Sequence, residues 1–156
     1  MGTWTNNDGL YIKFGENEAL QNIGGEYEQD GGIHTVEFQI NASDLAAVGS
    51  QGLLSDTVYI PNNAFIDSAQ FRVETAFVGA SGTLDFGLVR KNRTTEIDYD
   101  GIDSAIAVAA LTAGATIACD GALIGTRLSQ AGIPTARNNT TDFSAGKGWL
   151  RIVYRI

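Results

Sequence analysis

The sequence of 156 residues contains one cysteine (Cys119), one histidine (His34) and two prolines. A single cysteine excludes an internal disulfide, and its place in the apolar run ATIACDGALIG indicates a small buried residue. A single histidine without a cysteine partner argues against a zinc site within one chain. A Ser–His–Asp hydrolase would need that histidine, but the chain has no G-x-S-x-G motif. We therefore expect His34 to be a structural or surface residue.

Long apolar runs and an excess of basic residues are also missing. No stretch approaches the roughly 20 apolar residues of a membrane-spanning helix, and the start MGTWTNNDGL lacks the basic and apolar regions of a signal peptide. We expect a protein made in the cytoplasm, with no membrane partner. The formal net charge is -8, from 18 acidic and 10 basic residues. This balance argues against a nucleic-acid partner, because phosphate backbones attract a basic face.

The negative charge is concentrated in the first third of the chain. Residues 1–56 hold nine acidic residues and one basic residue, Lys13, whereas residues 57–156 hold nine of each. Two interpretations remain open for this acidic third. It docks on a basic protein surface, or it is a solvated skin that keeps the protein soluble.

What the sequence does have is 19 glycines and runs in which apolar and polar residues alternate. This pattern predicts an all-β fold, an antiparallel β-sandwich of jelly-roll-like topology with one short helix. We expect one domain over residues 1–156, with residues 1–32 forming an extended N-terminal arm or an irregular region. The clearest strands are His34–Ile40, Ile66–Val78, Thr83–Val89 and Trp149–Ile156.

Weaker patterns fill the remaining segments. A helical turn is expected over Asn41–Val48, and the short helix over the alanine-rich stretch Ile102–Leu111. Residues 129–148 are polar and predict a loop or an edge region. Short strands are expected over Thr57–Ile60, Thr116–Cys119 and Ala122–Ile124.

A cluster of acidic residues marks the segment Glu96–Asp103, predicted to be a turn. Its alternating acids and glycine resemble the start of a calcium loop, but position 12 of such a loop would be Ala107, which has no carboxylate. A catalytic pair of Asp98 and Asp100 lacks anything that would fix the separation of the two carboxylates. The acids can equally pair with the preceding bases or favour a helix N-terminus. We expect no catalytic, cofactor-binding or metal-binding residue and no cofactor, while cation binding at this segment stays open.

The outward face of the last strand predicts a protein interface. It presents Trp149, Arg151 and Arg155, and tryptophan and arginine are enriched at interfaces. The alternative is an ordinary sheet face covered by a loop, since Val153 lies between the two arginines. Trp4 and Tyr11, in the polar N-terminal stretch, either anchor this stretch on a partner or pack on their own domain.

Several segments together carry a resemblance to a known family. They are DGLYIKFGENEA, HTVEFQI, SDTVYIPNNAFIDSAQFRVETA, GTLDFGLVRKNRTTEIDYDGI, GALIGT and WLRIVYRI, whereas residues 15–32 and 129–146 match least. In this order the chain resembles the head decoration (cement) proteins of tailed bacteriophages, which have a jelly-roll-like β-sandwich. The resemblance implies a virion protein on the capsid surface, a homotrimer seated on the major capsid protein, and no catalytic residues.

Two other classes of function remain as alternatives. A carbohydrate- or receptor-binding sandwich, such as a fibre head or a lectin-like module, would need an exposed aromatic platform, for which Tyr99 between two aspartates is the best candidate. An enzyme on a jelly-roll scaffold of the cupin type would need several histidines for its metal, and this chain has one. We therefore favour the capsid decoration protein.

Overall fold

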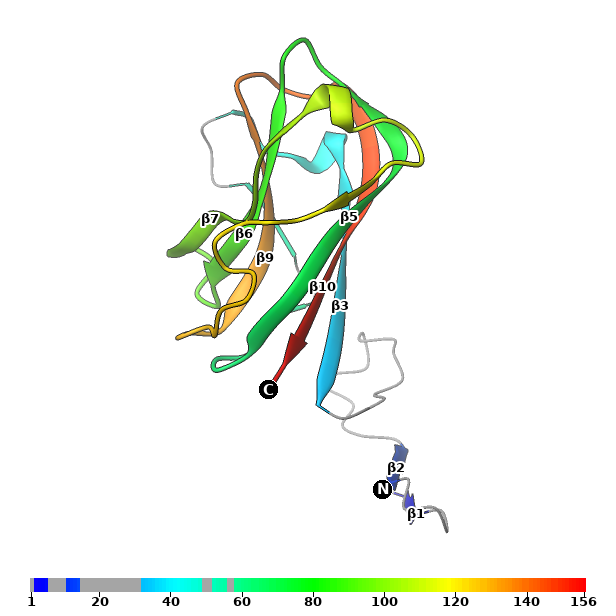
Figure 1. Cartoon of the computed structure of the whole chain (residues 1–156), viewed down its shortest axis with the longest axis vertical. Helices are drawn as coiled ribbons and strands as arrows, with labels where there is room; N and C mark the ends of the chain where they lie inside the picture. Colours follow the sequence, from blue (N-terminus) through cyan, green and yellow to red (C-terminus); the bar gives the residue numbers. More distant parts are fainter. Residues whose placement is uncertain (1, 6–10, 15–31, 49–51, 56–57) are drawn as a thin grey trace.

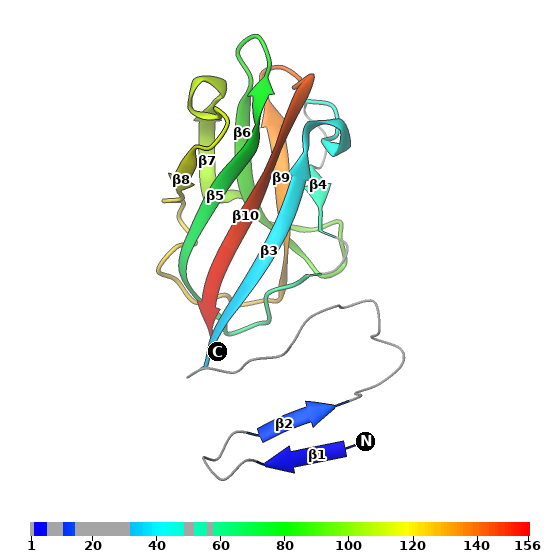
Figure 2. The same cartoon turned by 90° about the vertical axis from the view of Figure 1, so that its right-hand side faces the viewer.

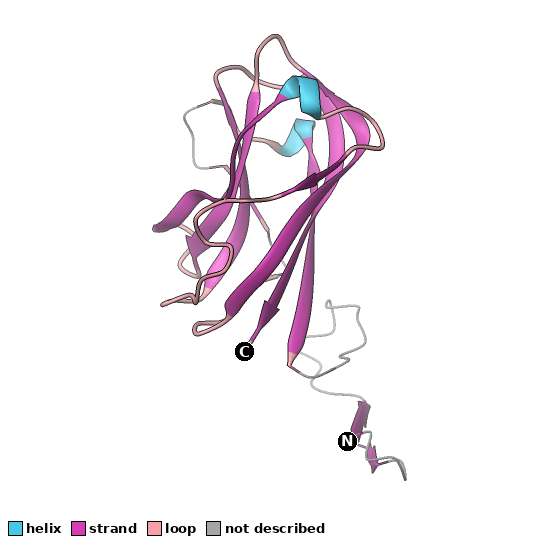
Figure 3. Ribbon diagram, viewed as in Figure 1, coloured by secondary structure: helices cyan, strands magenta, loops and turns pink. Residues whose placement is uncertain are grey.

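The computed structural model describes residues 2–5, 11–14, 32–48, 52–55 and 58–156, which form strands, turns and two short 3-10 turns (Figure 3). Eight strands between Ile33 and Arg155 form two antiparallel four-stranded sheets that pack face to face (Figure 1). The predicted all-β antiparallel sandwich is confirmed. The strands are β3 (Ile33–Asn41), β4 (Leu53–Leu54), β5 (Phe65–Val78), β6 (Thr83–Arg90), β7 (Glu96–Ala107), β8 (Thr116–Ala118), β9 (Gly132–Asn139) and β10 (Ala145–Arg155).

The order of the strands is that of a jelly roll. One sheet has the order β3-β10-β5-β8 and the other the order β4-β9-β6-β7. Counted along the chain, the first strand of the sandwich therefore lies beside the last, and the second beside the seventh, as in two interlocked Greek keys. Figure 2 faces the β3-β10-β5-β8 sheet, with the other sheet behind it.

The two sheets bury a continuous apolar core between them. Phe71 of β5 and Phe86 of β6 meet across the two layers, with ring centroids 4.7 Å apart. Alternation places one side chain in every two toward this core on each long strand, because successive strand residues point to opposite faces. Fully buried large side chains are Phe71, Phe86, Ile40, Ile60, Ile66, Leu84, Leu88, Ile102, Leu111, Leu150, Ile152 and Val73. Each contributes about 1.5–3 kcal/mol by leaving water.

Two further strands lie outside the sandwich. β1 (Gly2–Thr5) and β2 (Tyr11–Phe14) pair antiparallel with each other and form a separate two-stranded sheet. In Figures 1 and 2 this hairpin lies beyond the end of the sandwich at which β3 begins. Most of residues 1–32 falls outside the described residues, so the expected arm or irregular region stays a prediction.

The helix expected over Ile102–Leu111 is wrong. The chain continues as strand β7 to Ala107 and then makes one 3-10 turn, Val108–Ala110. Thr83 and Leu84 of β6 pair with the end of β7, and Ile102 and Ile106 are buried. Packing of these isoleucines and pairing with β6 override the helical propensity of the alanines, which amounts to a few tenths of a kcal/mol per residue. The expected turn over Glu96–Asp103 is likewise part of this strand.

The loop or edge region expected over residues 129–148 is also wrong over much of its length. It contains β9, which lies inside its sheet between β4 and β6, and the start of β10. One of the polar residues that concealed β9 is satisfied inside the fold: Asn138 is buried and its Nδ2 donates to Asp142 Oδ1 at 2.7 Å. Ala122–Ile124 is a turn rather than a strand.

Two weaker expectations have clear outcomes. The turn expected within Asn41–Val48 is the 3-10 turn Ala42–Asp44, and the strand expected near Thr116 is β8. The strand expected over Thr57–Ile60 is reduced to an isolated bridge between Ile60 and Gly132, and residue 57 lies outside the described residues.

Candidate docking surface

Strand β10 occupies a central position in its sheet, so its outward side chains lie in the middle of an open sheet face. Trp149 stands opposite Gln39 of β3 and Arg72 of β5, and Arg151 stands opposite Glu37 and Gln70. No described helix or strand covers these side chains (Figure 2). We call this surface the outer face; its central residues are Glu37, Gln39, Gln70, Arg72, Trp149 and Arg151.

A single carboxylate holds Trp149 in place on the outer face. The indole Nε1 donates to Glu74 Oε2 at 3.1 Å, and Lys147 Nζ donates to Glu74 Oε1 at 3.0 Å. The hydrogen bonds from Lys147 and then Trp149 lower the pKa of Glu74 below its ordinary value. With its N–H occupied, the half-buried Trp149 presents the apolar part of its ring to whatever docks there.

The arginines of this sheet differ in how their charge is compensated. Arg155 forms a bidentate pair with Asp67, from Nε to Oδ2 at 2.8 Å and from Nη2 to Oδ1 at 2.6 Å, and lies over the ring of Phe65. Arg72 and Arg151 form no ion pair within the described part of the chain. On this face the three bases Arg72, Arg151 and Lys147 stand against the two carboxylates Glu37 and Glu74, so the described bases exceed the described acids by one.

The centre of the outer face is shallow. Glu37, Gln70, Arg72, Trp149 and Arg151 line a depression of about 110 Å³. Sites for small organic ligands usually have about 300–1,000 Å³. A broad protein surface fits this shape better than a small molecule.

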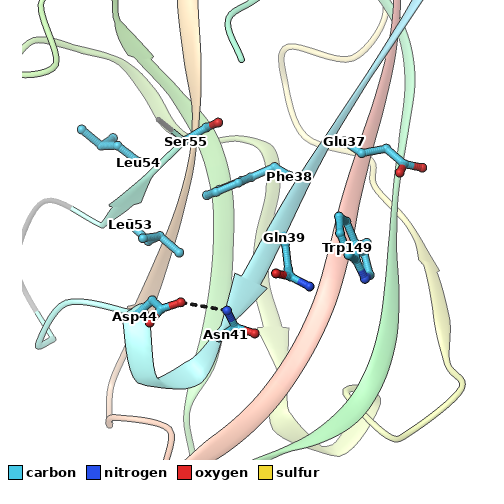
Figure 4. Close-up of a pocket in the computed structure, with 9 residues that line it drawn as sticks. All are labelled: Glu37, Phe38, Gln39, Asn41, Asp44, Leu53, Leu54, Ser55 and Trp149. Carbon is cyan, nitrogen blue, oxygen red and sulfur yellow. Dashed lines mark hydrogen bonds between the residues drawn. The ribbon is translucent and has the colours of Figure 1, made fainter. Parts of the chain in front are cut away.

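A larger groove of about 330 Å³ runs beside the edge strand β3, where the two sheets open (Figure 4). In Figure 4, Phe38 projects from β3 toward Leu53 and Leu54 of β4, so one side of the groove is apolar. Glu37, Gln39 and Trp149 line its other side. Asn41 Nδ2 donates to Asp44 Oδ2 at 2.8 Å next to the groove.

The residues predicted to form an interface lie in two places. The structure brings Trp149, Arg151 and Arg155 to one side of β10, as the alternation predicts, although Arg155 is engaged by Asp67. Trp4 and Tyr11 lie on β1 and β2, at neighbouring positions of the hairpin, and their side chains are outside the described part of the structure. The interface role of all five residues stays a prediction.

Sequence reasoning missed most of the surroundings of Trp149. Alternation along Ile66–Val78 predicts that Gln70 and Arg72 lie on the outward side of that strand, but only the register between β5 and β10 places them beside Trp149 and Arg151. Leu53 and Leu54 gave no strand signal beyond being two adjacent apolar residues. Their position beside Phe38 depends on the folding of distant segments.

The acidic segment Glu96–Asp103 forms most of the edge strand β7 and shows no site in this structure. Burial raises the pKa of Asp98, with a further rise from the neighbouring Asp100. No group of three or more metal-ligating side chains occurs among the residues that the structure describes. The candidate sugar platform, Tyr99, is half-buried and carries the Arg137 guanidinium over its ring at 4.8 Å.

The remaining single residues take structural positions. His34 stacks on Tyr154, with ring centroids 5.2 Å apart. Cys119 is buried as expected, and its burial raises the pKa of the thiol. None of the helices in the described ranges is long and apolar enough to cross a membrane.

Comparison with known proteins identifies the fold. No family model matches the sequence, and no curated protein matches it. A chain of the cyanophage Pam1 capsid asymmetric unit has the same fold with a TM-score of 0.54 at 9% identity, over 85% of this chain and 91% of that chain. A chain of the capsid of Ralstonia phage GP4 matches with a TM-score of 0.54 at 16% identity, over 87% and 93%. At these identities the likeness concerns the fold alone.

Proposed function

We propose that this chain is a virion structural protein that decorates a phage head, binds the major capsid protein on the outside of the shell and stabilises it. The observation that carries the proposal is the match to chains of two phage capsid structures over 91% and 93% of those chains. A match over nearly the whole chain concerns the complete jelly roll rather than a shared fragment. The proposed role is non-enzymatic and consists of contact alone.

The outer face is the docking surface that we propose for the capsid. It combines a fixed tryptophan with Arg72 and Arg151, which form no ion pair within the described residues, and these residue types dominate the energy of protein interfaces. Arg72 and Arg151 favour an acidic patch on the capsid protein. Many copies bound to one shell would make even a modest affinity per copy sufficient, because each contact on the shell acts together with the others.

Binding to glycans or to a receptor is the competing function, and the geometry supports it less. Its candidate platform Tyr99 is capped on one side by Arg137, and the depression at the centre of the outer face has about 110 Å³. A sugar ring needs an accessible aromatic face and a rim of free polar groups. One face of the Tyr99 ring is covered by Arg137 and is therefore not accessible to a sugar.

A binding assay with phage heads tests the proposal. Full-length protein is mixed with heads of the encoding phage that have been stripped of it, and co-sedimentation and a cryo-electron microscopy map are recorded. We expect specific binding, and at least tenfold weaker binding for Trp149→Ala and for Arg151→Glu. Arg90→Glu makes the same change of charge at an exposed position on the other sheet and should bind normally.

Two outcomes would contradict this proposal. Absence of the protein from purified particles would remove the decoration role altogether. Normal binding of both outer-face variants would show that the capsid contacts another surface of the sandwich.

A further inference from the structure

Strand β3 is the one long, unprotected sheet edge of the described sandwich. The other edge strands are blunted: β4 has 2 residues and β8 has 3, while β7 carries several acids and pairs irregularly with β6. β3 has 9 residues and pairs with β10 in an unbroken register. It contains no proline and one charged residue, Glu37. An edge of this kind accepts a further strand readily.

The β1–β2 hairpin lacks a third strand beside it among the described strands. Its strands pair with each other and with no other described strand. A two-stranded hairpin alone is marginal in water and gains stability when a third strand or a packed face is added. Among the described strands, the outer edge of β2 is therefore a second edge without a partner strand.

We propose that the hairpin of one copy adds to the β3 edge of a neighbouring copy, with β2 as the new strand beside β3. The groove next to β3 suits such a strand, because alternate side chains of an added strand enter a pocket while its backbone pairs with the edge. The apolar side of this groove is formed by Phe38, Leu53 and Leu54. In β2, apolar Ile12 and Phe14 alternate with Tyr11 and Lys13.

Charge favours the same partners. Lys13 is the one basic residue among residues 1–32, and Glu37 is the one charged residue of β3. Residues directly opposite on paired strands interact when their charges differ. The pairing would thus set Lys13 against Glu37 at the outer side of the new strand pair.

The structure indicates that the hairpin beside β3 comes from a neighbouring copy rather than from the same chain. Among the described residues of one chain, β2 and β3 do not pair with each other, and the hairpin lies beyond the end of the sandwich (Figures 1 and 2). The 18 residues between Phe14 and Ile33 span up to about 60 Å when extended, enough to reach an adjacent molecule. Such a head-to-tail contact forms a ring where the rotation between neighbouring copies closes, and an open filament where it does not. The inference does not depend on capsid binding.

Cysteine cross-linking in purified full-length protein tests the exchange. One set of variants carries Tyr11→Cys or Lys13→Cys, and a second, distinguishable by mass, carries Thr35→Cys, Glu37→Cys or Gln39→Cys. After mixing and mild oxidation we expect a mixed disulfide dimer for at least one pairing. The native Cys119 is buried and should not react. Ala118→Cys, exposed on β8 at the far edge of the same sheet, is the matched control and should give no mixed dimer.

The outcomes separate the possible occupants. If no pairing exceeds the Ala118→Cys control, the exchange is overturned. A further variant carries one cysteine of each set in the same chain. If it forms only an intramolecular disulfide and no disulfide between chains, the hairpin binds its own sandwich and the exchange between copies is likewise overturned.

A charge exchange gives a second, independent readout. Glu37→Lys should weaken self-association, measured by sedimentation equilibrium, by about tenfold or more, and Lys13→Glu in the same chain should restore it. Ala118→Lys should leave it unchanged. Unaltered association of Glu37→Lys, or failure of the second substitution to restore it, would overturn the contact between Lys13 and Glu37.

Discussion

At the scale of single residues, Asp85 joins three strands of the second sheet. Its carboxylate is 3% exposed. It accepts a hydrogen bond from the backbone N–H of Ala105 in β7 at 2.7 Å and from Arg137 Nη2 in β9 at 3.3 Å. Asn139 Nδ2 donates to the same carboxylate. Ala105 has a φ of 53°, a left-handed conformation that alanine rarely adopts, and this hydrogen bond helps to hold it.

Replacing Asp85 by alanine is expected to lower the free energy of unfolding by about 2–4 kcal/mol, because it leaves the backbone N–H of Ala105, the half-buried Asn139 amide and the half-buried Arg137 guanidinium without their acceptor. Chemical denaturation monitored by tryptophan fluorescence measures the change. Asp120→Ala, at an exposed position, should change stability by less than about 0.5 kcal/mol. Equal effects of the two substitutions would contradict the role of Asp85.

Asp103 predicts how stability depends on pH. Burial raises the pKa of its carboxyl above the ordinary aspartate value of 3.8, with a further rise from the nearby Asp120 carboxylate. The folded protein therefore binds a proton more tightly than the unfolded chain, and this group adds stability as the pH falls through its folded pKa toward 3.8.

Asp103→Asn should consequently unfold at a higher temperature than the unmodified protein at pH 7. The difference should shrink as the pH approaches 3.8, where the native carboxyl is also becoming neutral. Thermal unfolding at a series of pH values measures both. A difference that stays constant with pH would show that the carboxylate charge is not the cause.

At the scale of elements, a strand could be predicted from the sequence when its apolar and polar residues alternate regularly. β3, β5, β6 and β10 each turn one apolar side to the core, so their patterns were sufficient. β9 was missed because Pro134, Thr135 and Asn138 are buried although their types favour loops. No local pattern reports that Asp142 will accept a hydrogen bond from the buried Asn138.

The candidate surface divides in the same way. Alternation along the last strand placed Trp149 and Arg151 together on one face. The charges around them could not be predicted without the register between β5 and β10. The groove could not be predicted without knowing that β4 lies beside β3. These are relations between distant segments, which a single strand pattern does not contain.

The pairing of β6 with β7 depends on a glycine. A Cβ atom added at Gly87 would lie 2.1 Å from the backbone oxygen of Asp98 and 2.5 Å from that of Tyr99. Backbone cannot yield as a flexible side chain does, so Gly87→Ala should push β7 away and cost about 1–3 kcal/mol or more. Hydrogen exchange should show lost protection in residues 96–100. Ser104→Ala, exposed on the same strand, is the control and should keep that protection.

At the scale of the whole molecule, assembly is the main expectation. A head-to-tail exchange of hairpins closes most simply into a small ring, and we propose a homotrimer. Native mass spectrometry should then find three times the chain mass of 16.5 kDa. A species that remains monomeric at high protein concentration would contradict the trimer.

The position of β10 also has a consequence for synthesis. This strand, Ala145–Arg155, lies between β3 and β5, so the earlier strands flank a vacant place until residue 155 has left the ribosome. Co-translational folding can therefore assemble the sheet β4-β9-β6-β7 first, but it cannot complete the other one. A chain that stops before Ala145 would lack β10 and leave two open edges and an uncovered core, which is a route to aggregation rather than to a shortened working protein.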